Sequence, residues 1–200
     1  MYRHQLSLLI LLIAPVLSSQ TNAQTGMWRN FQNKALVKFG WSCATPAAYP
    51  SAKLTRVVNR AMKQNEFGGF GSWADRAFAF DLNGDHKLEF FVPLDCGGTG
   101  NCTWGLFALN PERQLGIIVG QYLYVHRVAG QWPDLISYSH LSAVEGSLMT
   151  YHFSRRSYRS FGPRYPIDQG SSDSEIQPGV NSKMPAFLDA AKVACDSPGS

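Results

Sequence analysis

Residues 115–127 read LGIIVGQYLYVHR. Apolar residues in this segment alternate with glycine, tyrosine and histidine, and a period of two is typical of a β-strand with one face more apolar than the other. We therefore predict one long strand, Leu115–Arg127. The same periodicity on both sides of this segment predicts further strands, at Ala77–Phe80, Leu88–Leu94, Thr103–Leu109, Leu135–His140, Leu148–Phe153 and Ser157–Phe161.

The connections between these predicted strands are short and rich in turn residues. They include Asn110-Pro111, Ala129-Gly130, Glu145-Gly146 and Arg155-Arg156. Short connections place successive strands side by side in antiparallel order. The prediction is an antiparallel β-meander of six or seven strands.

Helical periodicity is found on either side of the strand-rich region. A clear i, i+3, i+4 apolar pattern predicts a helix over Ser51–Asn65, and a weaker one predicts a helix over Met27–Phe39. Pro185 precedes a short predicted helix, Ala186–Ala194. The predicted fold class is therefore α+β, with two N-terminal helices, the meander and a short C-terminal helix.

The composition limits the class of protein. The chain has 200 residues, of which 44% are hydrophobic and 16% charged, which suits one folded domain and excludes a disordered chain. The net charge is +4, and the nearest approach to a basic cluster is Arg155, Arg156 and Arg159. Because the basic residues are otherwise scattered, we expect no nucleic-acid partner.

Residues 1–23 have the pattern of a secretory signal peptide. Arg3 precedes an apolar run from Leu6 to Leu17, and small residues occupy the expected cleavage region before Gln24. A membrane anchor is the alternative, but Pro15 interrupts a run that is shorter than the roughly 20 residues a spanning helix needs. We predict a single domain, residues 24–200, that is periplasmic or secreted and has no membrane span once the signal is removed.

Four cysteines follow the predicted cleavage site. An even number of cysteines in an exported chain predicts two disulfides, and four cysteines allow three pairings. We favour Cys96–Cys102, which would close a small glycine-rich ring, and Cys43–Cys195, which would close a long loop. Zinc ligation by the cysteines is the alternative, but the paired CxxC spacing of such sites is absent.

Residues 81–89, DLNGDHKLE, contain the sharpest motif. The side chains of Asp81, Asn83, Asp85 and Glu89 occupy positions 1, 3, 5 and 9, and the Lys87 carbonyl occupies position 7. Oxygens at these positions of a tight turn can converge on Ca²⁺, which takes six to eight oxygen ligands. The alternative is a hairpin turn rich in Asx residues that binds no metal.

The motif is not an EF-hand, because His86 stands at position 6 and Val92 at position 12, and because strands are predicted on both sides of it. It resembles the strand–loop–strand calcium loop of the FG-GAP/VCBS type, which occurs in integrin-like propellers and in many secreted bacterial proteins. The resemblance implies calcium binding and not a fold. The order of this loop, a C-G-x-x-G-x-C ring and a W-P-D segment is also similar to that of small exported bacterial proteins.

Other chemistry-bearing residues lack a supporting pattern. His126, His140 and His152 could bind zinc if they converged, but their spacing is not that of a metal site. An acid pair for glycoside cleavage could be drawn from Asp75, Asp134 and Glu145, and nothing in the sequence brings these together. No G-x-S-x-G motif is present, so we predict no catalytic residue.

Tyrosines offer a possible contact surface. Tyr122 and Tyr124 would lie on one face of the long predicted strand, where they could form a flat binding surface or pack across strands.

The sequence thus predicts an exported, calcium-stabilised and disulfide-stapled binding domain whose partner is a protein or glycan outside the cytoplasm. The ring between Cys96 and Cys102 is the candidate contact, through Thr99 and Asn101, because loops on rigid scaffolds often carry recognition. A hydrolase of cell-envelope polymer or peptide is the alternative.

Overall fold

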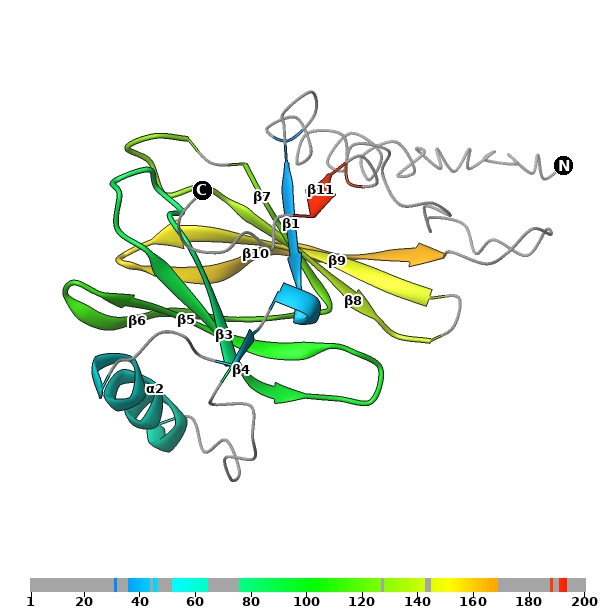
Figure 1. Cartoon of the computed structure of the whole chain (residues 1–200). Coiled ribbons are helices and arrows are strands. Elements are labelled where there is room, and N and C mark those ends of the chain that lie inside the picture. The colour runs from blue at the N-terminus through cyan, green and yellow to red at the C-terminus, as the bar shows by residue number, and fades with distance from the viewer. Residues whose placement is uncertain are drawn as a thin grey trace, which may run out of the picture. The chain divides into compact units, whose positions relative to one another are not determined.

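Two β-sheets, one α-helix and a short 3-10 helix, η2 (Trp41–Cys43), make up most of the described part of the chain (Figure 1). The computed structural model describes residues 31, 36–43, 45–46, 52–64, 76–126, 128–142, 145–168, 188 and 191–193. Apart from Phe31, these residues lie in one unit of the chain, residues 33–200. The predicted signal peptide, residues 1–23, lies outside the described residues.

The first sheet has five strands in the order β2-β3-β4-β5-β6, and all neighbouring pairs are antiparallel. The strands are β2 (Thr45–Pro46), β3 (Arg76–Phe80), β4 (Glu89–Cys96), β5 (Cys102–Leu109) and β6 (Glu112–Gly120). The predicted strands that correspond to β3, β4 and β5 are confirmed to within two residues at each end.

The second sheet has six strands in the order β10-β9-β8-β7-β1-β11. Its strands are β1 (Val37–Gly40), β7 (Tyr122–Val125), β8 (Leu135–His140), β9 (Glu145–Ser154), β10 (Ser157–Asp168) and β11 (Lys192–Val193). Its pairs are antiparallel except β1 with β11, which is parallel. Strand β8 has the predicted bounds, whereas β9 and β10 are longer than predicted, and Glu145-Gly146 lies in β9 and not in a turn.

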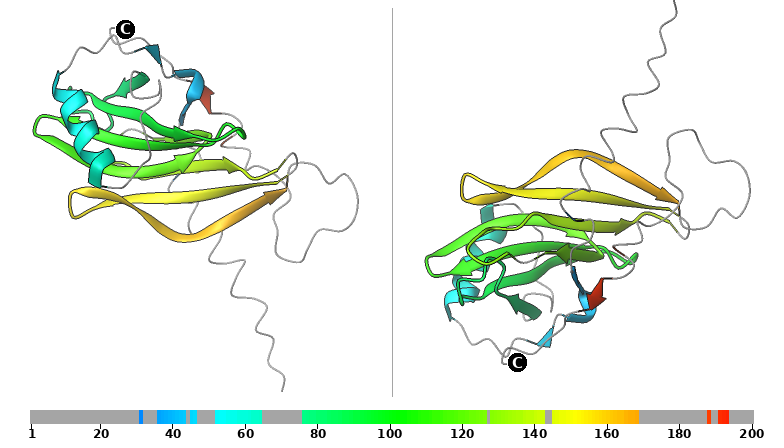
Figure 2. Two further views of the ribbon diagram at one scale, coloured as in Figure 1. Left: turned by 90° about the horizontal axis from the view of Figure 1, so that it is seen from below. Right: turned by 90° about the horizontal axis from the view of Figure 1, so that it is seen from above.

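The two sheets pack face to face, as the two layers in Figure 2 show, and enclose the main hydrophobic core. Trp104 and Phe91 from the first sheet and Leu123 and Leu135 from the second are buried between them. Phe78 stacks on Phe91 with ring centroids 4.6 Å apart. Because the core is rich in aromatic rings, both sheets are held by large buried areas.

The predicted helix is confirmed as α2 (Ala52–Gln64), and it covers the other face of the first sheet. Its apolar side chains pack on residues of β3, β4 and β5, which are Ala77, Phe90, Val92, Leu94 and Phe107. Strand β4 is therefore buried on both faces, and this explains why its sequence is nearly all apolar rather than alternating.

The predicted fold class, α+β with three helices, is wrong, because the described residues are mostly β with α2 as their only α-helix. The last three residues of the first predicted helix, residues 37–39, instead lie in β1, between β7 and β11. There Phe39 stacks on Phe78, with ring centroids 5.0 Å apart. Strand pairing and ring packing outweigh a weak local preference for helix. At the C-terminus, Lys192–Val193 is a strand, and most of the predicted helix Ala186–Ala194 lies outside the described residues.

The single long strand predicted over Leu115–Arg127 is also wrong, because the chain leaves the first sheet at Gly120 and enters the second at Tyr122. A Cβ atom added to Gly120 would lie 2.8 Å from the Tyr138 carbonyl oxygen, so only glycine fits this close crossing. A β-bulge between Leu106 and Phe107 also shifts the register of β6. As a result Ile118 is buried, while Val119 is 43% exposed.

Candidate functional site

The predicted calcium loop connects β3 to β4 and is anchored at both ends. Phe80 pairs with Glu89 in the strand register, which closes the hairpin. Leu82, inside the loop, has no exposed surface and packs in the core between the sheets. The flanking elements are strands, as predicted, so the loop is not part of an EF-hand.

Asp81 organises the first half of the loop through backbone hydrogen bonds. Its Oδ1 accepts from the N–H groups of Gly84 at 2.7 Å and Asp85 at 3.1 Å, and its Oδ2 accepts from the N–H of His86 at 3.1 Å. One carboxylate thus satisfies three donors that the tight turn removes from the strand ladder.

Asn83 and Asp85 continue this pattern toward β4. The Asp85 N–H donates to Asn83 Oδ1 at 3.0 Å, and the Lys87 N–H donates to Asp85 Oδ1 at 2.9 Å. The Lys87 N–H is the main reason that the pKa of Asp85 lies below its usual value, because it stabilises the ionised carboxylate. The Lys87 ammonium lies 3.6 Å from Asp85 Oδ2.

Two residues of the loop adopt the left-handed backbone conformation, Gly84 with φ 70° and His86 with φ 64°. Glycine at position 86 would adopt it without strain, so histidine there has a cost of about 1 kcal/mol. At Gly84 an added Cβ would lie 2.9 Å from Ala129 Cα, and the Gly130 N–H donates to the Asn83 carbonyl at 2.6 Å. The loop is therefore packed against the turn at residues 128–131.

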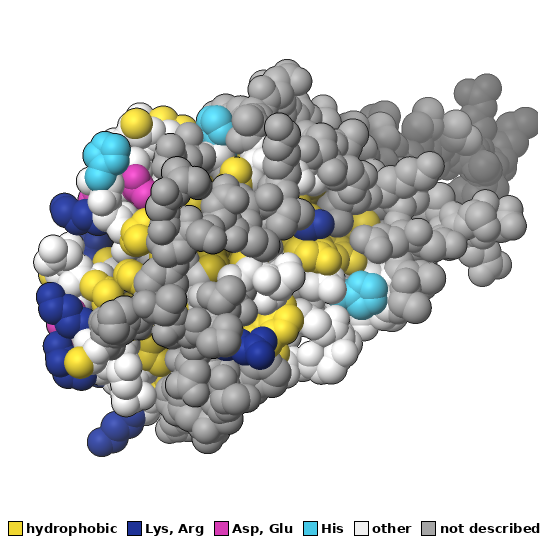
Figure 3. Space-filling model, in the orientation of Figure 1, with side chains coloured by type: hydrophobic (Ala, Val, Ile, Leu, Met, Phe, Trp, Pro, Cys, Tyr) yellow, Lys and Arg dark blue, Asp and Glu magenta, His cyan; other side chains and the backbone are white. Residues whose placement is uncertain are grey.

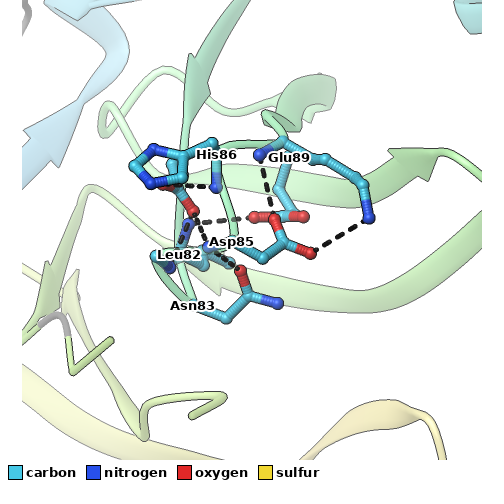
Figure 4. A network of polar contacts seen from close by, with 8 residues as sticks. Leu82, Asn83, Asp85, His86 and Glu89 are labelled. Atoms are coloured by element: carbon cyan, nitrogen blue, oxygen red, sulfur yellow. Dashed lines mark hydrogen bonds and ion pairs between the residues drawn. The ribbon is translucent and has the colours of Figure 1, made fainter. Parts of the chain in front are cut away.

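Glu89 is the buried acid of the site, with 3% of its surface exposed. Its Oε2 accepts from the Leu82 N–H at 2.9 Å (Figure 4). Burial raises the pKa of Glu89 to about 7, and the negative charges of Asp85 and Asp81 add to this rise.

The raised pKa predicts how stability depends on pH. Because the folded-state pKa of about 7 exceeds the ordinary value of 4.5, this group stabilises the fold most below pH 4.5 and loses that effect as the pH rises through 7. Metal-free protein should lose about 2–3 kcal/mol of unfolding free energy from this group between pH 5 and pH 8. Denaturant unfolding in the presence of EDTA, at pH values from 5 to 8, measures this loss of unfolding free energy. Glu89→Gln should remove the loss, and an unchanged pH dependence in that variant would contradict the assignment.

The four oxygen-bearing side chains of the motif thus lie in one loop, but their oxygens largely accept backbone N–H groups. Within the described ranges, no three His, Cys, Asp or Glu side chains are arranged to hold a metal ion. The side chains of the loop are nevertheless suited to Ca²⁺, because their possible ligand atoms are all hard oxygens. A carboxylate oxygen that accepts one hydrogen bond also has a further lone pair for a metal ion.

The structure does not bring the other described sequence candidates into a metal site. The three histidines form no metal-binding group in the part of the chain that the structure covers, and His152 instead pairs with Asp134, Nδ1 to Oδ1 at 2.6 Å. The Glu145 N–H donates to Ser142 Oγ at 3.1 Å in the β8–β9 turn. Asp75 lies outside the described residues.

The tyrosines mainly pack across strands. Tyr124 is buried, and Tyr122 stacks on Tyr138 with ring centroids 6.2 Å apart. The Lys38 ammonium lies 3.7 Å from the centroid of the Tyr122 ring. These contacts favour packing over a flat binding surface.

The predicted Cys96–Cys102 disulfide is confirmed, and it closes the turn between β4 and β5. Inside the ring, the Gly97 N–H donates to the Asn101 carbonyl at 2.9 Å. Cys43 is also disulfide-bonded, and its predicted partner, Cys195, lies outside the described residues.

Thr99 and Asn101 have different surroundings in this ring. Thr99 is exposed. The Asn101 carboxamide faces the end of β8, where its Oδ1 accepts from the His140 N–H at 2.8 Å and its Nδ2 donates to the His140 carbonyl. Asn101 therefore joins the ring to the second sheet and has a structural role, which leaves Thr99 as the exposed contact candidate.

A cavity of about 410 Å³ adjoins the loop, and we refer to it as the loop pocket. Asn83, Asp85 and Glu89 contribute to one part of its wall, and its other lining residues include Lys87, Arg113 and Trp132. Sequence reasoning missed Arg113 and Trp132, because they come from β6 and from the β7–β8 connection and share no local pattern with the loop.

No helix among the described residues is long and apolar enough to cross a membrane. Comparisons of the chain with protein-family models, with curated proteins and with solved structures find no match in any of the three.

Proposed function

We propose that this protein is an exported binding domain that Ca²⁺ and disulfides stabilise and that holds a protein or glycan partner outside the cytoplasm. The observation that carries the proposal is the loop at residues 81–89, where three carboxylates and an amide lie in one anchored turn. A divalent cation there would neutralise carboxylates that otherwise raise the pKa of Glu89.

The residues that would hold the cation are Asp81, Asn83, Asp85 and Glu89, together with the Lys87 carbonyl. Several of these oxygens accept backbone N–H groups, so ligation uses their remaining lone pairs and some rotation of side chains. The cation supplies stability and local order, not chemistry.

Export is supported by the signal-like pattern of residues 1–23 and by the Cys96–Cys102 disulfide. Disulfides persist in oxidising compartments such as the periplasm or the extracellular space, and they are rare in the cytosol.

The exposed ring at residues 97–101 is the proposed contact, because a short disulfide loop loses little entropy on binding. Thr99→Trp should reduce recovery of the partner from an envelope extract at least tenfold. The melting temperature should stay within about 2 °C, since the Thr99 side chain is exposed and Asn101, which also donates to Thr99 Oγ1, keeps its two bonds to His140. The measurement is a pull-down from the native host, quantified against wild type.

Thr55→Trp is the matched control, because Thr55 is an exposed threonine on α2, away from the ring. This variant should recover the partner as wild type does. Equal recovery by Thr99→Trp and wild type would place the binding surface elsewhere.

A further inference from the structure

The loop pocket has walls of three chemical kinds. Asn83, Asp85 and Glu89 provide acceptors, Lys87 and Arg113 provide positive charge, and Trp132 provides an aromatic surface. Its volume of about 410 Å³ lies in the range of small-molecule sites, roughly 300–1,000 Å³. A ligand that suits all three walls has hydroxyl donors, one anionic group and an apolar face.

Arg113 has more donors than the described protein groups satisfy. Its Nη1 donates to the Arg156 carbonyl at 3.1 Å, whereas its buried Nε has no hydrogen-bond partner among the described residues. A guanidinium has five N–H donors and stays charged, so it requires acceptors. A carboxylate is the acceptor whose geometry matches a guanidinium best.

The surroundings of Arg113 favour an anionic ligand. Lys87, Arg155 and Arg156 are exposed. Burial and then the charge of Arg156 lower the pKa of Arg113, while the Glu89 carboxyl, when it is ionised, opposes this lowering. Figure 3 shows Lys and Arg side chains gathered at the end of the molecule where Figure 1 places α2 and the β5–β6 turn. Such a concentration of positive charge attracts anions toward the pocket.

Trp132 suits a sugar ring. One face of its indole stacks on Phe153, with ring centroids 4.4 Å apart, which fixes its orientation. It is half-buried and lines the pocket, and aromatic side chains are suited to packing against the C–H face of a pyranose. The oxygens of Asp85 and Glu89 and the Asn83 amide can accept ring hydroxyls.

We propose that the loop pocket binds an acidic saccharide, with the sugar carboxylate on Arg113 and the sugar ring against Trp132. This inference deepens the proposed function, because it names the ligand class of a glycan-binding domain. The Arg113 contact itself does not require a bound cation.

The test is calorimetric titration of the purified protein with a trimer of galacturonic acid, with the methyl ester of that trimer, and with a hexapeptide of Asp and Glu. The trimer should bind, and the neutral ester should bind at least tenfold more weakly. Arg113→Gln should weaken trimer binding at least tenfold, with Arg113→Lys between the two. Arg159→Gln, an exposed arginine of β10 that does not line the pocket, should match wild type.

Lys87→Gln provides a second variant, because Lys87 is exposed and its loss leaves the core intact. It should weaken trimer binding severalfold even if Arg113→Gln fails to fold. Absence of trimer binding at millimolar concentration, equal binding of the ester, full binding by Lys87→Gln or by folded Arg113→Gln, or binding of the peptide alone would overturn the proposal.

Titrations in CaCl₂ and in EDTA separate this inference from the calcium proposal. If the trimer still binds in EDTA and Ca²⁺ does not change the melting temperature, the saccharide site is supported and the calcium proposal is overturned. If Ca²⁺ raises the melting temperature but the trimer does not bind, the calcium proposal is supported and the saccharide site is overturned.

Discussion

Addition of 1 mM CaCl₂ to chelated protein is expected to raise the melting temperature by about 5–10 °C. A cation at 100 times its Kd stabilises the native state by about 2.7 kcal/mol, which corresponds to a Kd of about 10 µM. For a domain of this size each kcal/mol shifts the melting temperature by roughly 2–4 °C. Differential scanning calorimetry with and without EDTA measures the shift, which should be reversible.

Asp81→Asn should abolish the calcium shift while the loop keeps most of its hydrogen bonds. The asparagine Oδ1 can still accept from the Gly84 and Asp85 N–H groups, but Nδ2 cannot accept from the His86 N–H as Oδ2 does, so the charge, one ligand oxygen and one loop hydrogen bond are lost. The control is Asp95→Asn, an exposed carboxylate of β4 outside the loop, which should keep the full shift. A wild-type protein with neither a thermal shift nor a heat of Ca²⁺ binding would show that the loop is a metal-free turn.

Trp104→Ala is expected to cost about 3–5 kcal/mol of unfolding free energy, because it opens a cavity between the two sheets. Trp104 has no exposed surface, its ring meets that of Phe78 edge to face with centroids 5.4 Å apart, and its Nε1 donates to the Gly120 carbonyl at 2.9 Å. The side chain therefore supports both the core and the point where the chain changes sheets. Urea denaturation followed by circular dichroism measures the loss.

Two further variants separate these contributions. Trp104→Phe keeps most of the apolar surface but leaves the Gly120 carbonyl without its indole donor, so about 1–3 kcal/mol should be lost. Phe161→Ala removes an aromatic side chain that is 62% exposed and should change stability by less than about 0.5 kcal/mol. If Trp104→Ala cost no more than Phe161→Ala, the two sheets would not share this core.

Several elements could be predicted because their pattern is local. The helix α2 has its apolar face in its own i, i+3, i+4 spacing, and β8 follows the predicted turn at Ala129-Gly130. The Cys96–Cys102 ring joins residues only six apart, so their pairing needed little knowledge of the rest of the fold. The positions of the loop residues at 81–89 follow from spacing alone in the same way.

The assignment of strands to sheets is a different matter, because it depends on partners far away in the chain. Residues 115–127 alternate as one strand would, yet the close approach of Gly120 to Tyr138 and the bond from Trp104 divide them between two sheets. The helix-like spacing before Phe39 is likewise overridden by pairing of β1 with β7 and β11. Local periodicity contains no information about such pairings.

The candidate site likewise has one part that the local sequence predicts and one part that depends on long-range packing. The local sequence places the possible metal ligands Asp81, Asn83, Asp85 and Glu89 close together in the chain. The burial that raises the pKa of Glu89 arises only in the folded sheet. Arg113 and Trp132 reach the loop pocket from separate segments, so only tertiary packing makes them neighbours of the loop. Spacing along the chain therefore determined the oxygen ligands of the loop, and long-range packing decided which other groups share one pocket with them, because burial and proximity are properties of the whole fold.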